Sequence, residues 1–159
     1  PSQRSVRHFE RGRSIHPAYR FRMSAKDLAR FGLLYLRRGR WRDRQIVPSS
    51  WVDESTTSYS SPGEDGYGYM WWVYDAQMPG RFRRFHALGM YEASGTGGQK
   101  LTVLPGACLV IVHLRDLDVT TEFHSDQIWA LQEMILDARQ AEPAAHPHLV
   151  AFREPTSGE

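Results

Sequence analysis

The residues whose types and spacing could support chemistry lie in one glycine-rich run, Glu92-Ala93-Ser94-Gly95-Thr96-Gly97-Gly98-Gln99. Glycines beside a predicted strand allow a ligand to approach the backbone closely. Backbone N–H groups exposed in such a run can stabilise the negative charge that develops on an oxygen during acyl transfer. The run also fits an ordinary glycine-rich hairpin turn, and the local sequence by itself favours that simpler interpretation.

Other kinds of site are excluded by the spacing of their motifs. Gly95-Thr96-Gly97 begins a dinucleotide-binding pattern, but Lys100 stands where its last glycine is required. Gln99-Lys100-Leu101 lacks the Gly-Lys-Ser or Gly-Lys-Thr of a P-loop, and no Gly-x-Ser-x-Gly elbow occurs. The single cysteine, Cys108, excludes an internal disulfide and a cysteine-based zinc cluster, and we expect it to be a small buried apolar residue.

The histidines favour structural roles over catalysis or metal binding. His146 and His148 have His-x-His spacing, but no third ligand lies nearby in the sequence. Four other histidines show no carboxylate partner from spacing alone: His16, His86, His113 and His124. The sequence therefore predicts no metal and no cofactor.

A well-marked helix is predicted ahead of the glycine-rich run, over about residues 25–38. Ser24 fits its N-cap, Asp27 stands in capping-box position, and apolar residues recur at helical spacing. Gly39 supplies a C-terminal stop. Gly32 costs about 1 kcal/mol against alanine inside this helix, so we expect another backbone to approach closely there.

Shorter elements follow. Ser49 is predicted to cap a helix that ends near Thr56, and Thr57–Gly66 is predicted to be a flexible stretch. The aromatic run Tyr67–Tyr74 predicts a strand, and Phe82–Leu88 predicts a weaker one.

The last third of the chain predicts a hairpin and a helix. Pro105-Gly106 separates two predicted strands, Lys100–Leu104 and Ala107–Leu114. Because Leu109–Val112 is apolar on both faces, we expect it in the centre of the sheet with a layer on either side. Ser125 is predicted to cap a final helix with an apolar stripe formed by Ile128, Leu131, Ile135 and Ala138. With residues 1–23 taken as loop, the fold class is α+β, an antiparallel sheet flanked by helices.

Composition and charge fit one globular domain or part of a larger one. Of the 159 residues, 41% are hydrophobic and 24% are charged, and no apolar run approaches the roughly 20 residues that span a bilayer. Residues 1–44 hold 13 Lys and Arg against 3 Asp and Glu, whereas the rest holds 7 against 15. Nucleic-acid binding through this basic segment is thus a less favoured hypothesis.

Several segments occur in an order that is typical of one family. They are Met23–Leu36, Gly39-Arg40-Trp41, Gln45–Pro48, Trp51-Val52, Tyr67-Gly68-Tyr69 with Trp71-Trp72, and Ser94–Gln99 with Pro105. Together, over about residues 14–116, they resemble the C-terminal half of a β-lactamase/penicillin-binding-protein-like serine hydrolase, in particular its esterase and amidase relatives. The resemblance implies the C-terminal part of the β-lactamase/transpeptidase-like fold over residues 1–140. We expect a disordered tail over residues 141–159.

The resemblance also implies that the reactive groups lie elsewhere. In this family the serine of a Ser-x-x-Lys motif attacks the carbonyl, while its lysine and the tyrosine of a Tyr-x-Asn motif move protons. Neither motif is present, because Met23 and Gly97 stand three positions before Lys26 and Lys100, and the chain has no asparagine. No catalytic residue is therefore expected in this chain, and its partner would be the missing N-terminal half of the same domain.

The family's third motif usually reads Lys-Thr-Gly or His-x-Gly, and here Glu92-Ala93-Ser94 or Gly95-Thr96-Gly97 can occupy its place. The resemblance implies an oxyanion region formed by Ser94, Gly95, Thr96 and Gly97. It implies a substrate-pocket wall formed by Trp71, Trp72 or Tyr91. Relatives with a Gly-x-Gly-Gly-Gln run are esterases or amide hydrolases more often than β-lactamases, which favours a small ester or amide substrate in the intact protein.

The main alternative is a degenerate, non-catalytic binding or interaction module of the same fold. Alone, the chain is expected to be inactive, and to be poorly soluble or self-associating because its sheet is partly uncovered. The chain opens Pro1-Ser2-Gln3-Arg4 without Met, so we expect the natural start upstream and leave the compartment of this bacterial-type protein open.

Overall fold

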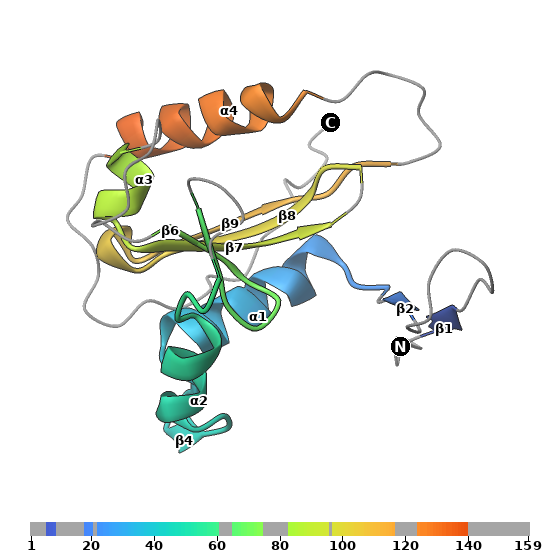
Figure 1. The fold of residues 1–159 in the computed structure, drawn as a ribbon, viewed down its shortest axis with the longest axis vertical. Coiled ribbons are helices and arrows are strands. Elements are labelled where there is room, and N and C mark those ends of the chain that lie inside the picture. The colour runs from blue at the N-terminus through green and yellow to red at the C-terminus, as the bar shows by residue number, and fades with distance from the viewer. Residues whose placement is uncertain are drawn as a thin grey trace, which may run out of the picture.

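A five-stranded antiparallel sheet lies between two helices in the computed structural model (Figure 1). The structure describes residues 6–8, 18–20, 22–60, 65–74, 83–95, 97–116 and 124–139. In spatial order the strands are β5 (Gly66–Tyr67), β6 (Trp72–Tyr74), β7 (Met90–Gly95), β8 (Gln99–Leu104) and β9 (Leu109–His113). Helix α1 (Ala25–Leu36) covers one face and α4 (Ser125–Asp137) the other. The predicted α+β class is confirmed.

Smaller elements surround this layer. The connections hold β3 (Arg40–Trp41), β4 (Arg44–Gln45), α2 (Ser49–Ser55), α3 (Arg83–Ala87) and the 3-10 turn η1 (Pro105–Ala107). Near the N-terminus β1 (Val6–His8) pairs with β2 (Ala18–Arg20). The expectation of loop throughout residues 1–23 is therefore wrong at these two strands. Among the described residues, no helix is long and apolar enough to cross a membrane.

Helix α1 forms as its sequence predicts. The Ser24 hydroxyl accepts a hydrogen bond from the Asp27 N–H at 3.1 Å, which satisfies a free donor of the first turn. Gly32 faces the sheet so closely that a Cβ there would lie 2.6 Å from Cγ1 of Val110 and 2.8 Å from Cδ1 of Leu101. A close approach thus explains the glycine, but side chains of the sheet make it, and the expectation of a backbone is corrected.

Gly39 ends α1 and starts the following hairpin. Its N–H donates to the carbonyl oxygen of Leu34 at 2.8 Å, and its own carbonyl accepts from the N–H groups of Ile46 and Val47 at 2.9 and 3.1 Å. Its φ of +81° favours glycine, and a Cβ would lie 2.0 Å from the carbonyl oxygen of Val47. Gly39 therefore joins the end of α1 to the residues that follow the β3–β4 hairpin.

Alternation along the strands separates two hydrophobic cores. On the α1 face the buried residues are Tyr35, Val52, Trp71, Val73, Tyr91, Leu101 and Val103. On the α4 face they are Tyr74, Phe85, Met90, Leu104, Ala107, Trp129 and Leu136. Because neighbouring residues of a strand point to opposite faces, β6, β7 and β8 each contribute to both layers.

The predicted position of Leu109–Val112 needs one correction. Val110 and Val112 pack toward the α1 core, and Leu109 and Ile111 toward the α4 core, so the expected layers on both faces are present. In the described sheet, however, β9 pairs with β8 alone and is an edge strand. Apolar residues on both faces of a strand indicate that other layers pack on both faces of the sheet. They do not indicate whether a second strand pairs with it on each side.

Two predicted strands differ from the structure. The strand predicted over Phe82–Leu88 is wrong, since Arg83–Ala87 forms α3 and the adjacent residues Phe85 and His86 are both buried, which a helix permits more readily than a strand. The strand predicted over Tyr67–Tyr74 is interrupted, because Met70 has a φ of +68° and only its two ends pair as β5 and β6.

The N-caps of two helices and the burial of several side chains differ from the predictions made from the sequence. Pro48 and His124 occupy the N-cap positions expected for Ser49 and Ser125, each of which starts its helix. On α4 the buried stripe is Ile128, Trp129, Gln132 and Leu136, while Leu131 is exposed. Cys108 is half-buried in the turn before β9, so its expected burial is wrong.

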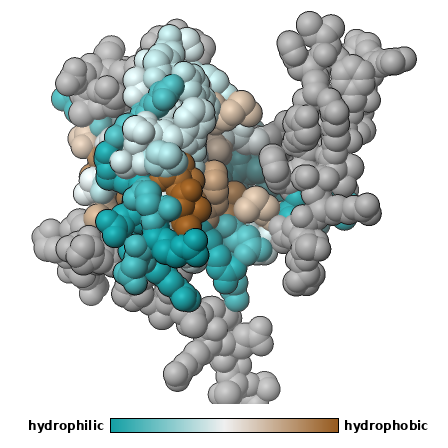
Figure 2. Space-filling view, turned by 90° about the horizontal axis from the view of Figure 1, so that it is seen from below, coloured by the Kyte–Doolittle hydropathy of each residue, from teal (hydrophilic) through white to brown (hydrophobic). Residues whose placement is uncertain are grey.

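The side of the molecule that carries α2 and β4 is less apolar than the cores. Figure 2 looks from this side and shows a small apolar area bordered by hydrophilic residues. Ile46, Trp51 and Tyr69 are exposed large side chains of this region. Tyr59 stacks on Tyr69 with ring centroids 5.1 Å apart, and Trp51 lies 5.6 Å from Tyr69. These rings support one another at the surface.

Candidate functional site

Three strands place polar side chains together on the α4 face of the sheet. Trp72 of β6 pairs with Glu92 of β7, and Ser94 of β7 pairs with Lys100 of β8. Residues two apart on a strand share a face, so this register gathers them beside one another. They line a pocket of about 240 Å³ together with Asp65 and Tyr74. We call it the Ser94 pocket.

A buried polar network forms the base of the Ser94 pocket. The Glu92 carboxylate, 1% exposed, pairs with the Lys100 ammonium and accepts a hydrogen bond from the Thr102 hydroxyl at 2.8 Å. The Gln132 side-chain amide of α4 donates to that hydroxyl at 2.9 Å. Lys100 Nζ also lies 5.6 Å from the centroid of the Trp129 ring, within reach of a cation–π interaction. The network ties β7 and β8 to α4.

The pocket carries more negative than positive charge on its lining side chains. Glu92 and Asp65 are carboxylates, whereas Lys100 is the one cation among the lining residues. Burial, together with the nearby charges of Glu92 and Asp65, raises the pKa of Tyr74 far above its usual range, so its hydroxyl stays protonated. Nε2 of His86, a buried residue of α3, lies 3.7 Å from the Asp65 carboxylate.

The glycine-rich turn lies directly beyond Ser94. Gly97 and Gly98 have φ values of +78° and +93°, a region that favours glycine. The Gly98 N–H donates to the Gly95 carbonyl at 3.3 Å, and the Gly98 carbonyl lies 2.8 Å from Nδ1 of His113. Thr96, which the resemblance assigns to the oxyanion region, lies outside the described residues.

Gln99 holds the far side of this turn. Its side-chain amide donates to the Arg115 carbonyl at 2.7 Å, and its side-chain oxygen accepts from the Arg115 N–H at 3.1 Å. This bidentate contact fixes the chain that leaves β9 against the start of β8. The turn that carries the predicted site is thus braced from β9 by His113 and from the following residues by Arg115.

The three predicted pocket-wall residues lie on two faces of the sheet. Trp72 lines the Ser94 pocket on the α4 face. Trp71 and Tyr91 are buried on the α1 face, where their rings meet edge to face with centroids 5.1 Å apart. The structure therefore brings Trp72 and Ser94 together, and does not bring Trp71 and Tyr91 to them. A role of these residues toward substrate stays a prediction.

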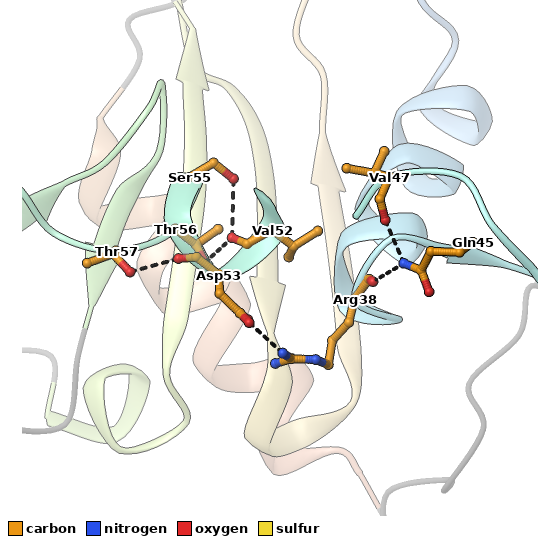
Figure 3. A network of polar contacts seen from close by, with 8 residues as sticks. All are labelled: Arg38, Gln45, Val47, Val52, Asp53, Ser55, Thr56 and Thr57. Atoms are coloured by element: carbon orange, nitrogen blue, oxygen red, sulfur yellow. Dashed lines mark hydrogen bonds and ion pairs between the residues drawn. The ribbon is translucent and has the colours of Figure 1, made fainter. Parts of the chain in front are cut away.

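A second, larger hollow of about 500 Å³ lies on the α1 side. Its lining includes Tyr35, Val73 and Tyr91 from the core. Arg38, which follows α1, and Asp53 of α2 also line it, and their side chains form an ion pair at 2.5 Å (Figure 3). Burial raises the pKa of Tyr91, and its neighbour Tyr35 adds to the effect. The Thr56 and Thr57 hydroxyls in its lining donate to the backbone carbonyls of Val52 and Asp53 at 2.8 and 2.7 Å.

The sequence interpretation gave no site role to Lys100, Thr102 or Gln132, which form the buried network with Glu92. Glu92 and Ser94 alternate on one strand, as do Lys100 and Thr102 on the next, so an antiparallel pairing had to place them on a shared face. The contribution of Asp65 and Gln132 carries no such signal, because they come from separate elements. Within the described residues, no group of three His, Cys, Asp or Glu side chains could hold a metal ion.

This architecture, an antiparallel sheet with helices on its faces, is consistent with a fragment of a β-lactamase-like fold. The chain is similar to the solved structure of a protein described as a 6-aminohexanoate-dimer hydrolase from Bacillus anthracis, with 26% sequence identity and a TM-score of 0.55. The match covers 75% of this chain and 29% of that protein, so the chain spans less than a third of its length. The similarity supports a hydrolase fold family.

No protein-family model matches the chain. No curated protein matches it either.

Proposed function

We propose that this chain is the C-terminal portion of a serine hydrolase that acts on small esters or amides. One observation carries the proposal, namely the similarity of three quarters of the chain to part of a hydrolase structure. The glycine-rich turn supports it, because it directly follows Ser94, which lines a polar pocket, and backbone N–H groups are common donors to the oxyanion of acyl transfer.

The motifs that this chain lacks determine which part of the catalytic machinery it would contribute. Acyl transfer needs a nucleophile, an adjacent base and donors for the oxyanion. The chain contains neither Ser-x-x-Lys nor Tyr-x-Asn, so the nucleophile and both proton carriers belong to the upstream polypeptide. Ser94, Gly95, Thr96 and Gly97 would supply the oxyanion side, and Trp72 an aromatic wall. The isolated chain would then be inactive.

The test compares this chain with the product of its coding region extended upstream. We expect the longer protein to contain Ser-x-x-Lys and to hydrolyse p-nitrophenyl acetate, with nitrocefin as a β-lactam probe. Replacing the serine of that motif by alanine should abolish turnover. The isolated chain should not exceed a heat-treated control.

Two results would reject the proposal. A start codon near Pro1 with no upstream hydrolase sequence would favour the alternative, a non-catalytic module of the same fold. Turnover by the isolated chain would show that the reactive groups have been assigned to the wrong part of the protein.

A further inference from the structure

Two buried tyrosines line the hollow on the α1 side, which we call the Tyr91 hollow. Tyr35 and Tyr91 are 8% and 6% exposed, and their ring centroids lie 6.4 Å apart. Among the residues that the structure describes, neither hydroxyl has a hydrogen-bond partner. A buried polar group without a partner is unfavourable, so a ligand in the hollow that pairs with these hydroxyls gains free energy from the contact.

The ion pair of Arg38 with Asp53 lies in the same lining and has unused hydrogen-bonding capacity. Nη2 of Arg38 donates to Oδ2 of Asp53, and both side chains are more than half exposed (Figure 3). Within the described part of the chain, Nη1 of Arg38 and Oδ1 of Asp53 have no protein partner. Burial raises the pKa of Tyr91, Tyr35 raises it further, Arg38 lowers it and Asp53 raises it. The Tyr91 hydroxyl is therefore within electrostatic reach of the ion pair.

Two threonine hydroxyls add acceptors to this lining. Thr56 and Thr57 donate their hydroxyl protons to backbone carbonyls of α2, as Figure 3 shows. Because each proton is already engaged, the lone pairs of the two hydroxyl oxygens are what a ligand can use. The Tyr91 hollow thus presents donors, acceptors and tyrosine hydroxyls that can act as either.

These groups select the charge and the shape of a ligand. Arg38 and Asp53 are neutral as a pair, so an anion meets the carboxylate and a cation meets the guanidinium, and neither gains from the pair as a whole. A hydroxyl group donates and accepts, and two on adjacent carbons match both members of the pair. Apolar side chains complete the lining and suit the C–H face of a saturated ring: Leu36, Val52, Val73 and Pro105. The volume of about 500 Å³ is within the range of about 300–1,000 Å³ of small-molecule pockets.

We propose that the Tyr91 hollow binds a neutral ring that carries adjacent hydroxyl groups, as sugars and cyclitols do. One ligand hydroxyl accepts a hydrogen bond from Arg38, its neighbour donates to Asp53, and a third pairs with the Tyr91 hydroxyl. The apolar side chains contact the carbon skeleton of the ring. This site rests on the described contacts and does not depend on the proposed hydrolase function.

The experiment titrates the full 159-residue chain with four neutral probes: the methyl α-glycosides of glucose, galactose and mannose, and myo-inositol. Sugars stabilise folded proteins by exclusion from their surfaces, so melting temperatures do not report binding here. Nitrogen–proton correlation NMR spectra are used instead, following the backbone N–H groups of Asp53, Thr56 and Thr57. We expect at least one probe to shift these signals saturably, with a Kd of roughly 1–10 mM. Whether a glycoside or inositol binds more tightly distinguishes a sugar from a cyclitol ligand.

Three further probes test which chemistry the hollow selects. They are the uronic acid and the amino sugar that correspond to the glycoside that binds most tightly, and methoxytetrahydropyran, which keeps the ring without its hydroxyl groups. Each should bind at least threefold more weakly than the best neutral probe, since the first two add a charge beside an ion pair and the third lacks the hydroxyls.

Matched variants assign the binding to named side chains. Tyr91→Phe removes one hydroxyl and should weaken binding of the best probe about three- to tenfold, the effect of one hydrogen bond. Tyr59→Phe, at an exposed tyrosine outside the lining, is the control and should leave binding unchanged. If Tyr91→Phe fails to fold, Asp53→Asn serves instead, because the position is exposed. It replaces the carboxylate by an amide and should weaken binding to a similar degree, whereas Asp43→Asn in the β3–β4 turn should not.

Three results would overturn the inference. The first is the absence of a saturable shift with all four neutral probes. The second is binding of methoxytetrahydropyran or a charged analogue as tightly as the best neutral probe. The third is equal binding by a variant and its control. The hydrolase test is decided separately, because it measures turnover by the longer protein and these titrations involve no turnover.

Discussion

Glu92 and Lys100 form a buried ion pair that joins two neighbouring strands, with their side chains 1% and 12% exposed. The remaining carboxylate oxygen of Glu92 is satisfied by the Thr102 hydroxyl, so the charge is both paired and hydrogen-bonded. Removing one partner of such a pair costs more than the pair itself contributes, because the other charge stays buried.

Glu92→Gln should therefore lower the free energy of unfolding by about 3–5 kcal/mol. Chemical denaturation followed by circular dichroism measures it. Glu54→Gln, at an exposed position of α2, is the matched control and should change stability by less than about 0.5 kcal/mol. A double variant that adds Lys100→Met should recover part of the loss. Strictly additive effects would show that the two charges do not depend on one another.

Gly32→Ala should also destabilise the chain, although alanine is the better helix former by about 1 kcal/mol. The added methyl group would lie 2.6 Å from Cγ1 of Val110, and displacing that side chain costs about 1–3 kcal/mol. Arg30→Ala on the exposed face of α1 is the control and should be nearly neutral. A more stable Gly32→Ala chain would mean that α1 and β9 are not packed as described.

Stability should fall as the pH rises above about 10. Burial raises the pKa values of Tyr74 and Tyr91 in the folded chain above the ordinary value of 10.0. Above that pH the unfolded chain ionises both hydroxyls while the folded chain keeps them protonated, so unfolding is favoured. Melting temperatures from pH 8 to 11 measure the effect. Tyr74→Phe and Tyr91→Phe should each flatten the decline, whereas the exposed control Tyr59→Phe should not.

The isolated chain should self-associate through β9. In the described part of the sheet this strand pairs on one side, and the exposed Leu114 follows it. Leu114→Lys should therefore shift size-exclusion profiles toward the monomer, because charge at a strand edge opposes pairing between molecules. Leu131→Lys, equally exposed on α4, should have little effect. A sharp monomeric peak for the unchanged chain, with cooperative melting, would contradict this prediction.

The sequence predicted elements best where a local rule determines them. Ser24 and Asp27 define the start of α1 through their own hydrogen bond, and Gly39 ends the helix through its left-handed backbone. The helix over Arg83–Ala87 cannot be recognised from the sequence, because five residues are too short for a helical period to show. The edge position of β9 was missed for a different reason, since lateral neighbours depend on residues far away in the sequence.

The candidate site divides in the same way. The glycine-rich turn after Ser94 is visible in the sequence because glycine has a distinct conformational preference. Glu92 lies opposite Thr102 and Lys100 opposite Ser94, so the ion pair of Glu92 with Lys100 is a diagonal contact on one face of the sheet. Alternation along the strands predicts this shared face once the two strands are known to be neighbours. The separation of Trp72 from Trp71 and Tyr91 also follows from alternation. Asp65 and Gln132 reach the pocket region from other elements, so no pattern along the chain reveals them.

The hydrogen bonds of Gly39 to Leu34, Ile46 and Val47 have a consequence for how the length of the β3–β4 hairpin can change. Gly39 precedes β3, and its carbonyl accepts hydrogen bonds from Ile46 and Val47 after β4, so the two ends of the hairpin are held together. This contact does not depend on the residues of the turn at Arg42 and Asp43. Extra residues at that tip should be accommodated outward, without redirecting the path into α2. Insertions at the Arg42–Asp43 turn should therefore change stability little, whereas a side chain at position 39 would clash with the Val47 carbonyl.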